Sequence, residues 1–205
     1  MIRVLVADDH PVVRAGLGAV IAEQDDLELV AEAENGANAV ALFRDHRPDV
    51  ALMDLRMPVM DGVEAIRTIT TEFPDARILA LTTYEGDADI RRALEAGASG
   101  YLLKDMLLTV VLTAVRAVHR GERVIPIPVA ARLAEFPERS DLTDREAEVL
   151  QLVARGLSNK EVARAIGRTD ETVKIHLKNA FAKLAVTDRT EAVTVALTRG
   201  LIHLD

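Results

Sequence analysis

Val4-Leu5-Val6-Ala7-Asp8-Asp9 is an apolar run of strand length that ends in two adjacent carboxylates. Three other apolar runs also stop at a polar side chain: Val50–Met53 before Asp54, Ile78–Leu81 before Thr82, and Gly100–Leu103 before Lys104. Continuous apolar runs are typical of parallel strands that are buried on both faces. Ligands of an open parallel sheet bind at the carboxyl ends of its strands. We therefore expect the four polar endings to converge on one site.

Composition limits the classes of protein to consider. The chain has 205 residues, 49% of them hydrophobic, which suits two small domains with buried cores. It has no apolar run long enough to span a membrane, and it starts without the layout of a signal peptide. Cysteine is absent, which excludes disulfides and cysteine-ligated zinc. These features predict a cytoplasmic protein without a membrane partner.

The net charge of −8 is unevenly distributed. Residues 1–120 carry 20 acidic and 12 basic side chains, whereas residues 121–205 carry 13 of each. Residues 158–189 contain seven basic and four acidic side chains. An acidic half joined to a locally basic half indicates two separate tasks in one chain.

The first half alternates between strand and helix patterns. We expect strands at 2–7, 27–33, 49–53, 77–81 and 99–103, and helices at about 11–22, 36–46, 63–73, 86–96 and 107–119. Such alternation predicts right-handed crossovers and a doubly wound, five-stranded parallel sheet over residues 1–120.

The polar strand endings suggest cation and phosphoryl chemistry. Asp9 alone could be only a helix cap, but three carboxylates in one crevice repel one another and favour a bound cation. Mg²⁺, or Mn²⁺, suits carboxylate ligands. Lys104 could then neutralise an incoming phosphoryl group, Thr82 could donate to one of its oxygens, and Asp54 could be the nucleophile.

Residues 1–120 resemble the flavodoxin-like receiver domain of bacterial two-component response regulators. The resemblance is carried by Asp8-Asp9, Asp54 through Gly62, Thr82, and Ala96 through Asp105. It implies that Asp54 accepts phosphate from a sensor histidine kinase, and that Asp9, Asp54 and the backbone carbonyl of Arg56 bind Mg²⁺ with help from Asp8. It also implies that Lys104 pairs with the phosphoryl group.

The same resemblance makes Thr82 the switch hydroxyl and Tyr101 the switch aromatic, which turns inward when phosphate is present. The apolar strand context alone allows Tyr101 to be a simple core residue. Many receivers carry proline after the lysine, with a cis bond, where this chain has Asp105. The sequence leaves the conformation of that bond open.

The second half has helical patterns only. Residues 121–140, interrupted by prolines, form the expected linker, with a possible short helix at 129–135. Capping boxes at Thr143/Glu146 and Ser158/Glu161 open two helices, a third covers about 170–184, and a last one covers about 188–199. This all-α, four-helix arrangement over 141–205 suggests a helix-turn-helix DNA-binding domain. A solvated basic face on a helical bundle explains the pattern equally well.

Residues 141–203 are similar to the LuxR-type DNA-binding domain, through Leu142–Leu150, Gly156–Ala163, Thr172–Leu177 and Lys183-Leu184. By position, this resemblance implies that Lys174, Ile175 and Lys178 reach base edges. It implies phosphate contacts for Ser158, Asn159, Lys160, Thr169, Thr172 and Asn179. Arg168 stands where the family usually has an apolar residue, and we expect it to face solvent or phosphate.

Together the two halves resemble a NarL/FixJ-type response regulator. The resemblance implies a transcription factor that is switched by phosphorylation, forms a homodimer, and binds double-stranded promoter DNA. Two other functions remain open for this sequence: a phosphorylation-independent factor, and a phosphoaspartate hydrolase of the haloacid dehalogenase type. The hydrolase would need an aspartate where this chain has Arg56. The five histidines lack ligand spacing, so we expect none of them in a site.

Overall fold

A parallel five-stranded sheet organises the first part of the chain in the computed structural model, which describes residues 1–83, 86–135 and 142–204. The strands are β1 (Ile2–Ala7), β2 (Leu27–Ala33), β3 (Val50–Met53), β4 (Ile78–Thr82) and β5 (Gly100–Leu103), in the order β2-β1-β3-β4-β5. Each strand lies within one residue of the range expected from the sequence. The predicted doubly wound sheet is therefore confirmed.

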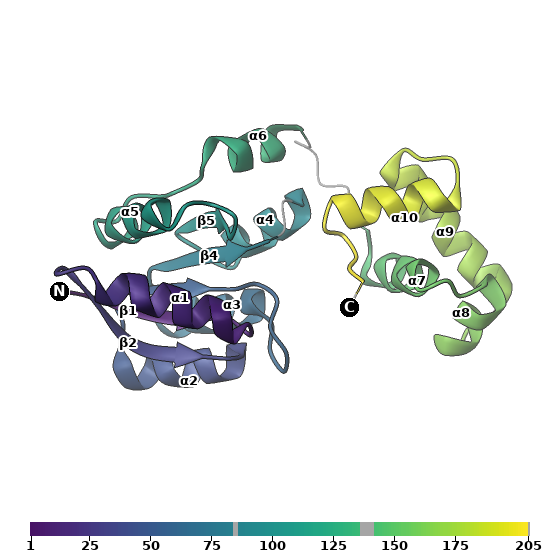
Figure 1. Ribbon diagram of the computed structural model, residues 1–205. Coiled ribbons are helices and arrows are strands. Elements are labelled where there is room, and N and C mark those ends of the chain that lie inside the picture. The colour runs from purple at the N-terminus through teal and green to yellow at the C-terminus, as the bar shows by residue number, and fades with distance from the viewer. Residues whose placement is uncertain (84–85, 136–141, 205) are drawn as a thin grey trace. The chain divides into compact units, whose positions relative to one another are not determined.

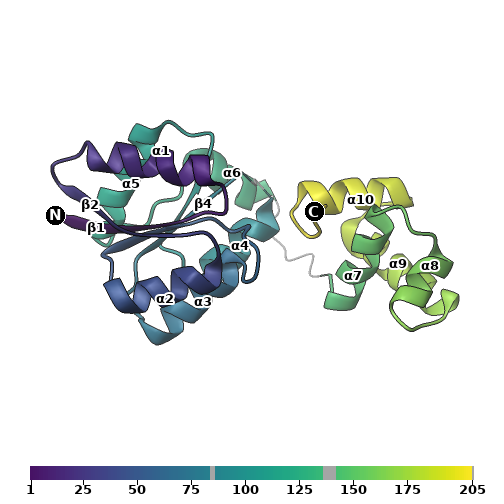
Figure 2. The same ribbon diagram turned by 60° about the horizontal axis from the view of Figure 1, so that its bottom comes forward.

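Helices cover both faces of this sheet. Helices α1 (Pro11–Ala22) and α5 (Leu108–His119) lie on one face, and α2 (Gly36–His46) and α3 (Gly62–Glu72) lie on the other (Figure 2). Every residue of β3, β4 and β5 is buried, which explains their unbroken apolar sequences. Helix α4 (Asp87–Glu95) connects β4 to β5.

Strand register brings the polar strand endings to one edge. Ala7 of β1 pairs with Met53 of β3, so the residues that follow them, Asp8 and Asp54, start side by side. Thr82 of β4 pairs with Leu103 of β5, so Lys104 leaves the sheet next to Thr82. The strand order changes direction between β1 and β3, and such switch points are where open α/β sheets bind ligands.

The C-terminal part is all helical. It consists of α7 (Asp144–Ala154), α8 (Asn159–Ala165), α9 (Asp170–Leu184) and α10 (Arg189–Thr198), packed around their own apolar core (Figure 1). Both predicted capping boxes are present: the side chains of Thr143 and Ser158 accept the third-residue N–H, and Glu146 and Glu161 accept in return. Local hydrogen bonding thus fixes where α7 and α8 begin.

The chain divides into two compact units, Met1–Tyr84 with Ile90–Ala131 and Glu85–Asp89 with Arg132–Asp205. Helix α6 (Ile127–Glu135) lies in the expected linker and confirms the short helix there, two residues earlier than predicted. The rest of that linker, from 136 on, lies outside the described residues. Within the described chain, no helix combines the length and apolar character needed to cross a membrane.

Candidate functional site

The ammonium of Lys104 bridges two buried carboxylates at the carboxyl edge of the sheet. Its Nζ lies 2.7 Å from Asp54 Oδ2 and 2.7 Å from Asp8 Oδ2. Asp54 is only 3% exposed, and the Lys104 side chain is 11% exposed. The predicted convergence of Asp8, Asp54 and Lys104 is therefore present in the structure.

The backbone holds these side chains in position. The Asp54 N–H donates to the Ala7 carbonyl at 2.8 Å, and the Lys104 N–H donates to the Thr82 carbonyl at 2.8 Å. Gly62 packs directly against the Asp54 backbone, and a Cβ at Gly62 would overlap the Asp54 carbonyl oxygen. The glycine in Asp61-Gly62 is thus required for a close approach of two backbone segments.

Burial and charge act in opposite directions on the two central groups. Burial raises the pKa of Asp54 above its ordinary value, although Lys104 and the Arg56 N–H, 3.3 Å from Oδ1, oppose the rise. Burial alone would lower the pKa of Lys104, but its hydrogen bonds and charge interactions with Asp54 and Asp8 outweigh this effect and raise it. Lys104 is therefore a fixed positive charge at neutral pH.

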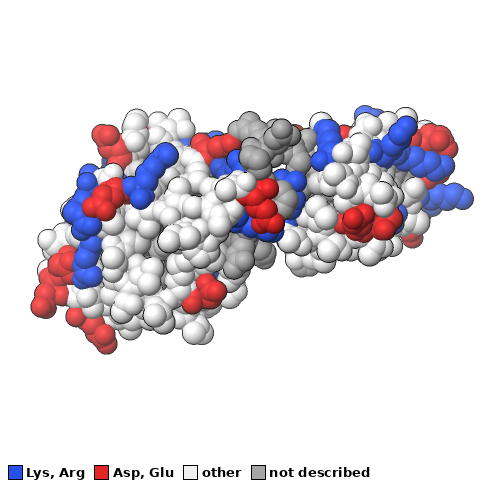
Figure 3. Space-filling model, turned by 90° about the horizontal axis from the view of Figure 1, so that it is seen from above, with Lys and Arg blue, Asp and Glu red and all other residues white. Residues whose placement is uncertain are grey.

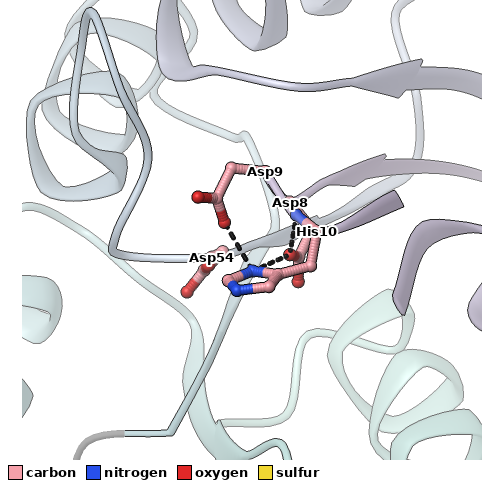
Figure 4. A group of neighbouring side chains, drawn as sticks. All are labelled: Asp8, Asp9, His10 and Asp54. Carbon is pink, nitrogen blue, oxygen red and sulfur yellow. Dashed lines mark hydrogen bonds and ion pairs between the residues drawn. The ribbon is translucent and has the colours of Figure 1, made fainter. Parts of the chain in front are cut away.

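The oxygen-rich edge is compatible with a divalent cation. Asp8, Asp9, His10 and Asp54 each offer one ligand atom, and these atoms all lie within 4.8 Å of one another (Figure 4). Asp9 Oδ1 is shielded from solvent and has no hydrogen-bond partner, a state that a cation would relieve. The donor set thus fits the cation implied by the resemblance. The Arg56 carbonyl stays a predicted ligand.

Thr82 and Tyr101 are both completely buried. Thr82 ends β4, directly above the carboxyl edge, and its carbonyl accepts from the Lys104 N–H. The Tyr101 N–H donates to the Val124 carbonyl at 2.9 Å, and its side chain lies in the core. This position agrees with the core interpretation and with the inward state of a switch, so the switch roles stay predictions.

The Lys104–Asp105 peptide bond, left open above, is trans. The expectation that no histidine lies in a site stays a prediction: the ring of His10 lies against Asp9 and Asp8, and its side chain is 66% exposed (Figure 4).

The predicted DNA contacts lie at the surface of the helical unit. Ile175 on α9 is 59% exposed, unusual for a large apolar side chain, and Lys174 and Lys178 are exposed beside it. The six predicted phosphate contacts are exposed or partly exposed: Ser158, Asn159, Lys160, Thr169, Thr172 and Asn179. Arg168 is exposed as expected.

Fewer basic side chains face solvent freely than the sequence count indicates. Lys174 Nζ lies 2.9 Å from both Asp170 Oδ2 and Glu171 Oε1. Lys183 pairs with the buried Glu146 at 2.7 Å. Arg189 donates to the Asn159 side chain and to the Leu157 carbonyl. The local excess of positive charge is therefore partly used to hold the unit together.

Comparison with known proteins identifies both units. Residues 4–116 match the family described as the response regulator receiver domain, and residues 140–196 match that of bacterial regulatory proteins, luxR family. The chain is 40% identical over 217 residues to the transcriptional regulatory protein LnrK of Bacillus subtilis, covering 98% of this chain and 99% of that protein. It is 41% identical over 207 residues to the response regulator protein VraR of Staphylococcus aureus, with the same coverage of 98% and 99%.

Solved structures give the same result. The response regulator ChrA of a heme-sensing two-component system has 40% identity and a TM-score of 0.59, with 98% of both chains covered. The RcsB–DNA complex, also of a two-component response regulator, has 27% identity and a TM-score of 0.68, with 96% of this chain and 98% of that one covered. This chain therefore belongs to the two-component response regulators that join a receiver domain to a LuxR-type DNA-binding domain, a family of DNA-binding regulators rather than enzymes.

Proposed function

We propose that this protein is a cytoplasmic transcription regulator that a sensor histidine kinase switches by phosphorylating Asp54. The proposed domain bounds are 1–120 for the receiver, 121–140 for the linker and 141–205 for the DNA-binding domain. The observation that carries the proposal is the Lys104 ammonium between the buried carboxylates of Asp54 and Asp8, 2.7 Å from each. A nucleophile beside a fixed positive charge is what phosphoryl transfer to aspartate needs.

In the proposed reaction, a carboxylate oxygen of Asp54 attacks the phosphorus of a phosphohistidine. The new O–P bond forms as the P–N bond to the kinase imidazole breaks, and the departing nitrogen keeps the electron pair. Lys104 is already within hydrogen-bond distance of Asp54 and can follow the added charge. A Mg²⁺ or Mn²⁺ ion, held by Asp8, Asp9, Asp54 and the Arg56 carbonyl, would neutralise phosphoryl oxygens.

The proposed response starts at Thr82 and Tyr101. Thr82 adjoins Lys104 through the β4–β5 register, so its hydroxyl is positioned to follow a phosphoryl oxygen on Asp54. Tyr101 lies on the neighbouring strand, paired with Ala80 of β4. A shift of Thr82 would therefore be transmitted to the β5 side of the sheet.

We assign dimerisation to the first turns of α1 and α5. These helices pack together on one face of the sheet and both begin at its carboxyl edge. Val12 on α1 is 84% exposed, and Leu108 and Val110 on α5 are exposed as well. An apolar groove of about 280 Å³ runs along α5, lined by Thr109, Val110, Thr113, Ala114, Ala117 and Val124. A large uncharged area also faces the viewer in Figure 3, which looks down on the side of α5 and α6.

A dimer would present two copies of α9 to successive major grooves of promoter DNA. In each copy, Lys174 and Lys178 would donate to base edges and Ile175 would contact a thymine methyl group. Ser158, Asn159, Lys160, Thr169, Thr172 and Asn179 would hold phosphates. Their exposure in the structure supports these roles.

The test uses the full chain with Mg²⁺ and a small phosphodonor, and measures intact mass, light scattering and DNA binding. We expect the wild type to gain one phosphoryl group, dimerise and bind DNA more tightly, and Asp54→Asn to do none of these. Asp105→Asn, an exposed neighbour of Lys104, is the matched control and should respond as the wild type. A phosphoryl group retained by Asp54→Asn would overturn the assignment.

A second pair of variants tests the dimer surface. Val12→Asp places a charge on the proposed interface and should leave the phosphorylated protein monomeric. Ile127→Asp makes the same change at an equally exposed apolar residue on α6 and should still dimerise. A wild type that dimerises and binds DNA equally well without phosphate would instead favour the phosphorylation-independent alternative.

A further inference from the structure

The guanidinium of Arg189 links the start of α10 to the turn that precedes α8. Its Nη1 donates to Asn159 Oδ1 at 3.1 Å, and its Nη2 donates to the Leu157 carbonyl. Arg189 and Asn159 are the first residues of their helices, and both are partly buried. One rigid group therefore fixes the backbone of this turn and the Asn159 side chain together.

This contact decides how the Asn159 amide is oriented. A guanidinium has only donors, so it can meet the amide oxygen but not the amide nitrogen. The Nδ2 nitrogen of Asn159 therefore lies on the side of the amide away from Arg189. Within the described part of the chain, Nδ2 donates to no protein group, and it is not shielded from solvent. Two N–H donors are thus held in a fixed orientation at the surface.

The neighbouring Ser158 hydroxyl is already used. It donates to Glu161 Oε2 at 2.6 Å and accepts from the Glu161 N–H at 3.4 Å, so its single proton belongs to the capping box. Ser158 also caps α8, which leaves the Asn159 amide without a capping role. Of these two neighbours, Asn159 is the one whose donors stay available in the described structure.

We propose that Arg189 is a positioning residue for DNA binding, which orients the Asn159 amide so that its two N–H donors meet a phosphate. This inference rests on the proposed function, in which Asn159 contacts the DNA backbone. An amide that is already oriented loses little rotamer freedom on binding, so more of its hydrogen-bond energy contributes to affinity. Arg189 acts through Asn159 and needs no contact of its own with DNA.

The first test measures DNA affinity by fluorescence anisotropy, with the full chain, Mg²⁺, a small phosphodonor and a labelled duplex of random sequence. Random sequence is sufficient because phosphate contacts carry no base information. Asn159→Ala should weaken binding about tenfold, a typical loss for a hydrogen bond to a charged acceptor. Arg189→Lys keeps the positive charge but lacks the planar fork that holds two acceptors, and it should weaken binding about threefold or more. Arg145→Lys, at an arginine that pairs with Glu148 on its own helix, is the matched control and should bind as the wild type.

The double variant separates positioning from an independent role. Asn159→Ala combined with Arg189→Lys should bind no more weakly than Asn159→Ala alone, because no amide is left to orient. Losses that multiply would mean that Arg189 acts on DNA directly or only stabilises the fold, and they overturn the inference. An unchanged affinity of Arg189→Lys overturns it as well. Failure of the wild type to bind the duplex overturns the proposed function itself.

The second test observes the amide without DNA. The side-chain amide signal of Asn159 in a proton–nitrogen NMR correlation spectrum is identified by its absence in Asn159→Ala. We expect this signal to move in Arg189→Lys and to stay in place in Arg145→Lys. A signal that does not move in Arg189→Lys overturns the positioning role even if the wild type binds DNA. Because this measurement needs no DNA, it distinguishes failure of the inference from failure of the proposed function.

Discussion

Asp54→Asn should stabilise the receiver unit at neutral pH while it abolishes phosphorylation. Burial raises the pKa of Asp54 above 3.8, its ordinary value, despite the opposing effect of Lys104. An acid with a raised pKa in the folded state contributes stability that is fully present below its unfolded pKa. That stability is lost as the pH rises through the folded pKa. At pH 7 the ionised Asp54 therefore lowers the free energy of unfolding.

The size of the effect follows from the geometry. Oxygens of Asp8 and Asp54 both lie 2.7 Å from Lys104 Nζ, so they are no more than twice that distance, 5.4 Å, apart. At an effective dielectric constant of about 20, this separation corresponds to about 3 kcal/mol of repulsion. Asparagine removes that repulsion and the cost of burying a carboxylate, several kcal/mol, but loses about 6 kcal/mol of attraction to Lys104 across 2.7 Å. We expect a net gain of about 1–2 kcal/mol.

The assay is thermal unfolding of the full chain in EDTA, followed by circular dichroism. A gain of about 1 kcal/mol raises the Tm of a unit of this size by about 3–5 °C. The gain should shrink as the pH falls through the raised pKa of Asp54, because the wild-type carboxylate then becomes protonated. Asp105→Asn, at an exposed position, should change little. A lower Tm for Asp54→Asn at pH 7, with Asp105→Asn unchanged, would refute the reasoning.

Four further predictions concern single side chains. Lys174→Ala should cost about 1–3 kcal/mol at a specific DNA site and much less on random DNA, measured by competition binding. Arg168→Ala should reduce the slope of log affinity against log salt by about one if Arg168 contacts a phosphate. The pKa of Glu146 is held below 4.5: burial would raise it, but Lys183 and the Thr143 cap outweigh that effect. The stability from Glu146 is thus present above pH 4.5 and lost as the pH falls through the lowered pKa. Glu146→Gln should lower the free energy of unfolding of the helical unit by about 1–2 kcal/mol at pH 7. It should also make that free energy less dependent on pH below 4.5. Val59 is exposed with a left-handed φ of 72°, so Val59→Gly should raise the free energy of unfolding by about 0.5–1 kcal/mol in urea titration.

The sheet could be predicted because its signals are local and repeated. Strands buried on both faces must be continuously apolar, so the polar residue after each run marks the sheet edge. Parallel register then aligns those edges, as the pairing of Ala7 with Met53 illustrates. Capping boxes are equally local, because the two partners of each hydrogen bond are only three positions apart in the sequence. These signals do not depend on the rest of the fold.

Side-chain partners were harder to predict because they depend on tertiary structure. Lys183 and Glu146 are 37 residues apart and meet only because α9 packs against α7. Lys174 is different: its spacings of three and four from Glu171 and Asp170 are those of helical ion pairs, and the sequence alone could have indicated them.

The charge balance at the sheet edge links stability to the proposed switch. Asp8, Asp9 and Asp54 converge there, and Lys104 bridges only two of them. A cation would supply the missing positive charge, and it should therefore stabilise the fold by mass action. Phosphorylation adds further negative charge at Asp54, so the phosphorylated state needs that cation more than the unphosphorylated state does. Binding free energies are reciprocal, and phosphorylation must then raise cation affinity by the factor by which the cation favours phosphorylation. Asp54→Asn should break this linkage, because it removes the carboxylate that is both the source of the repulsion and the proposed phosphate acceptor.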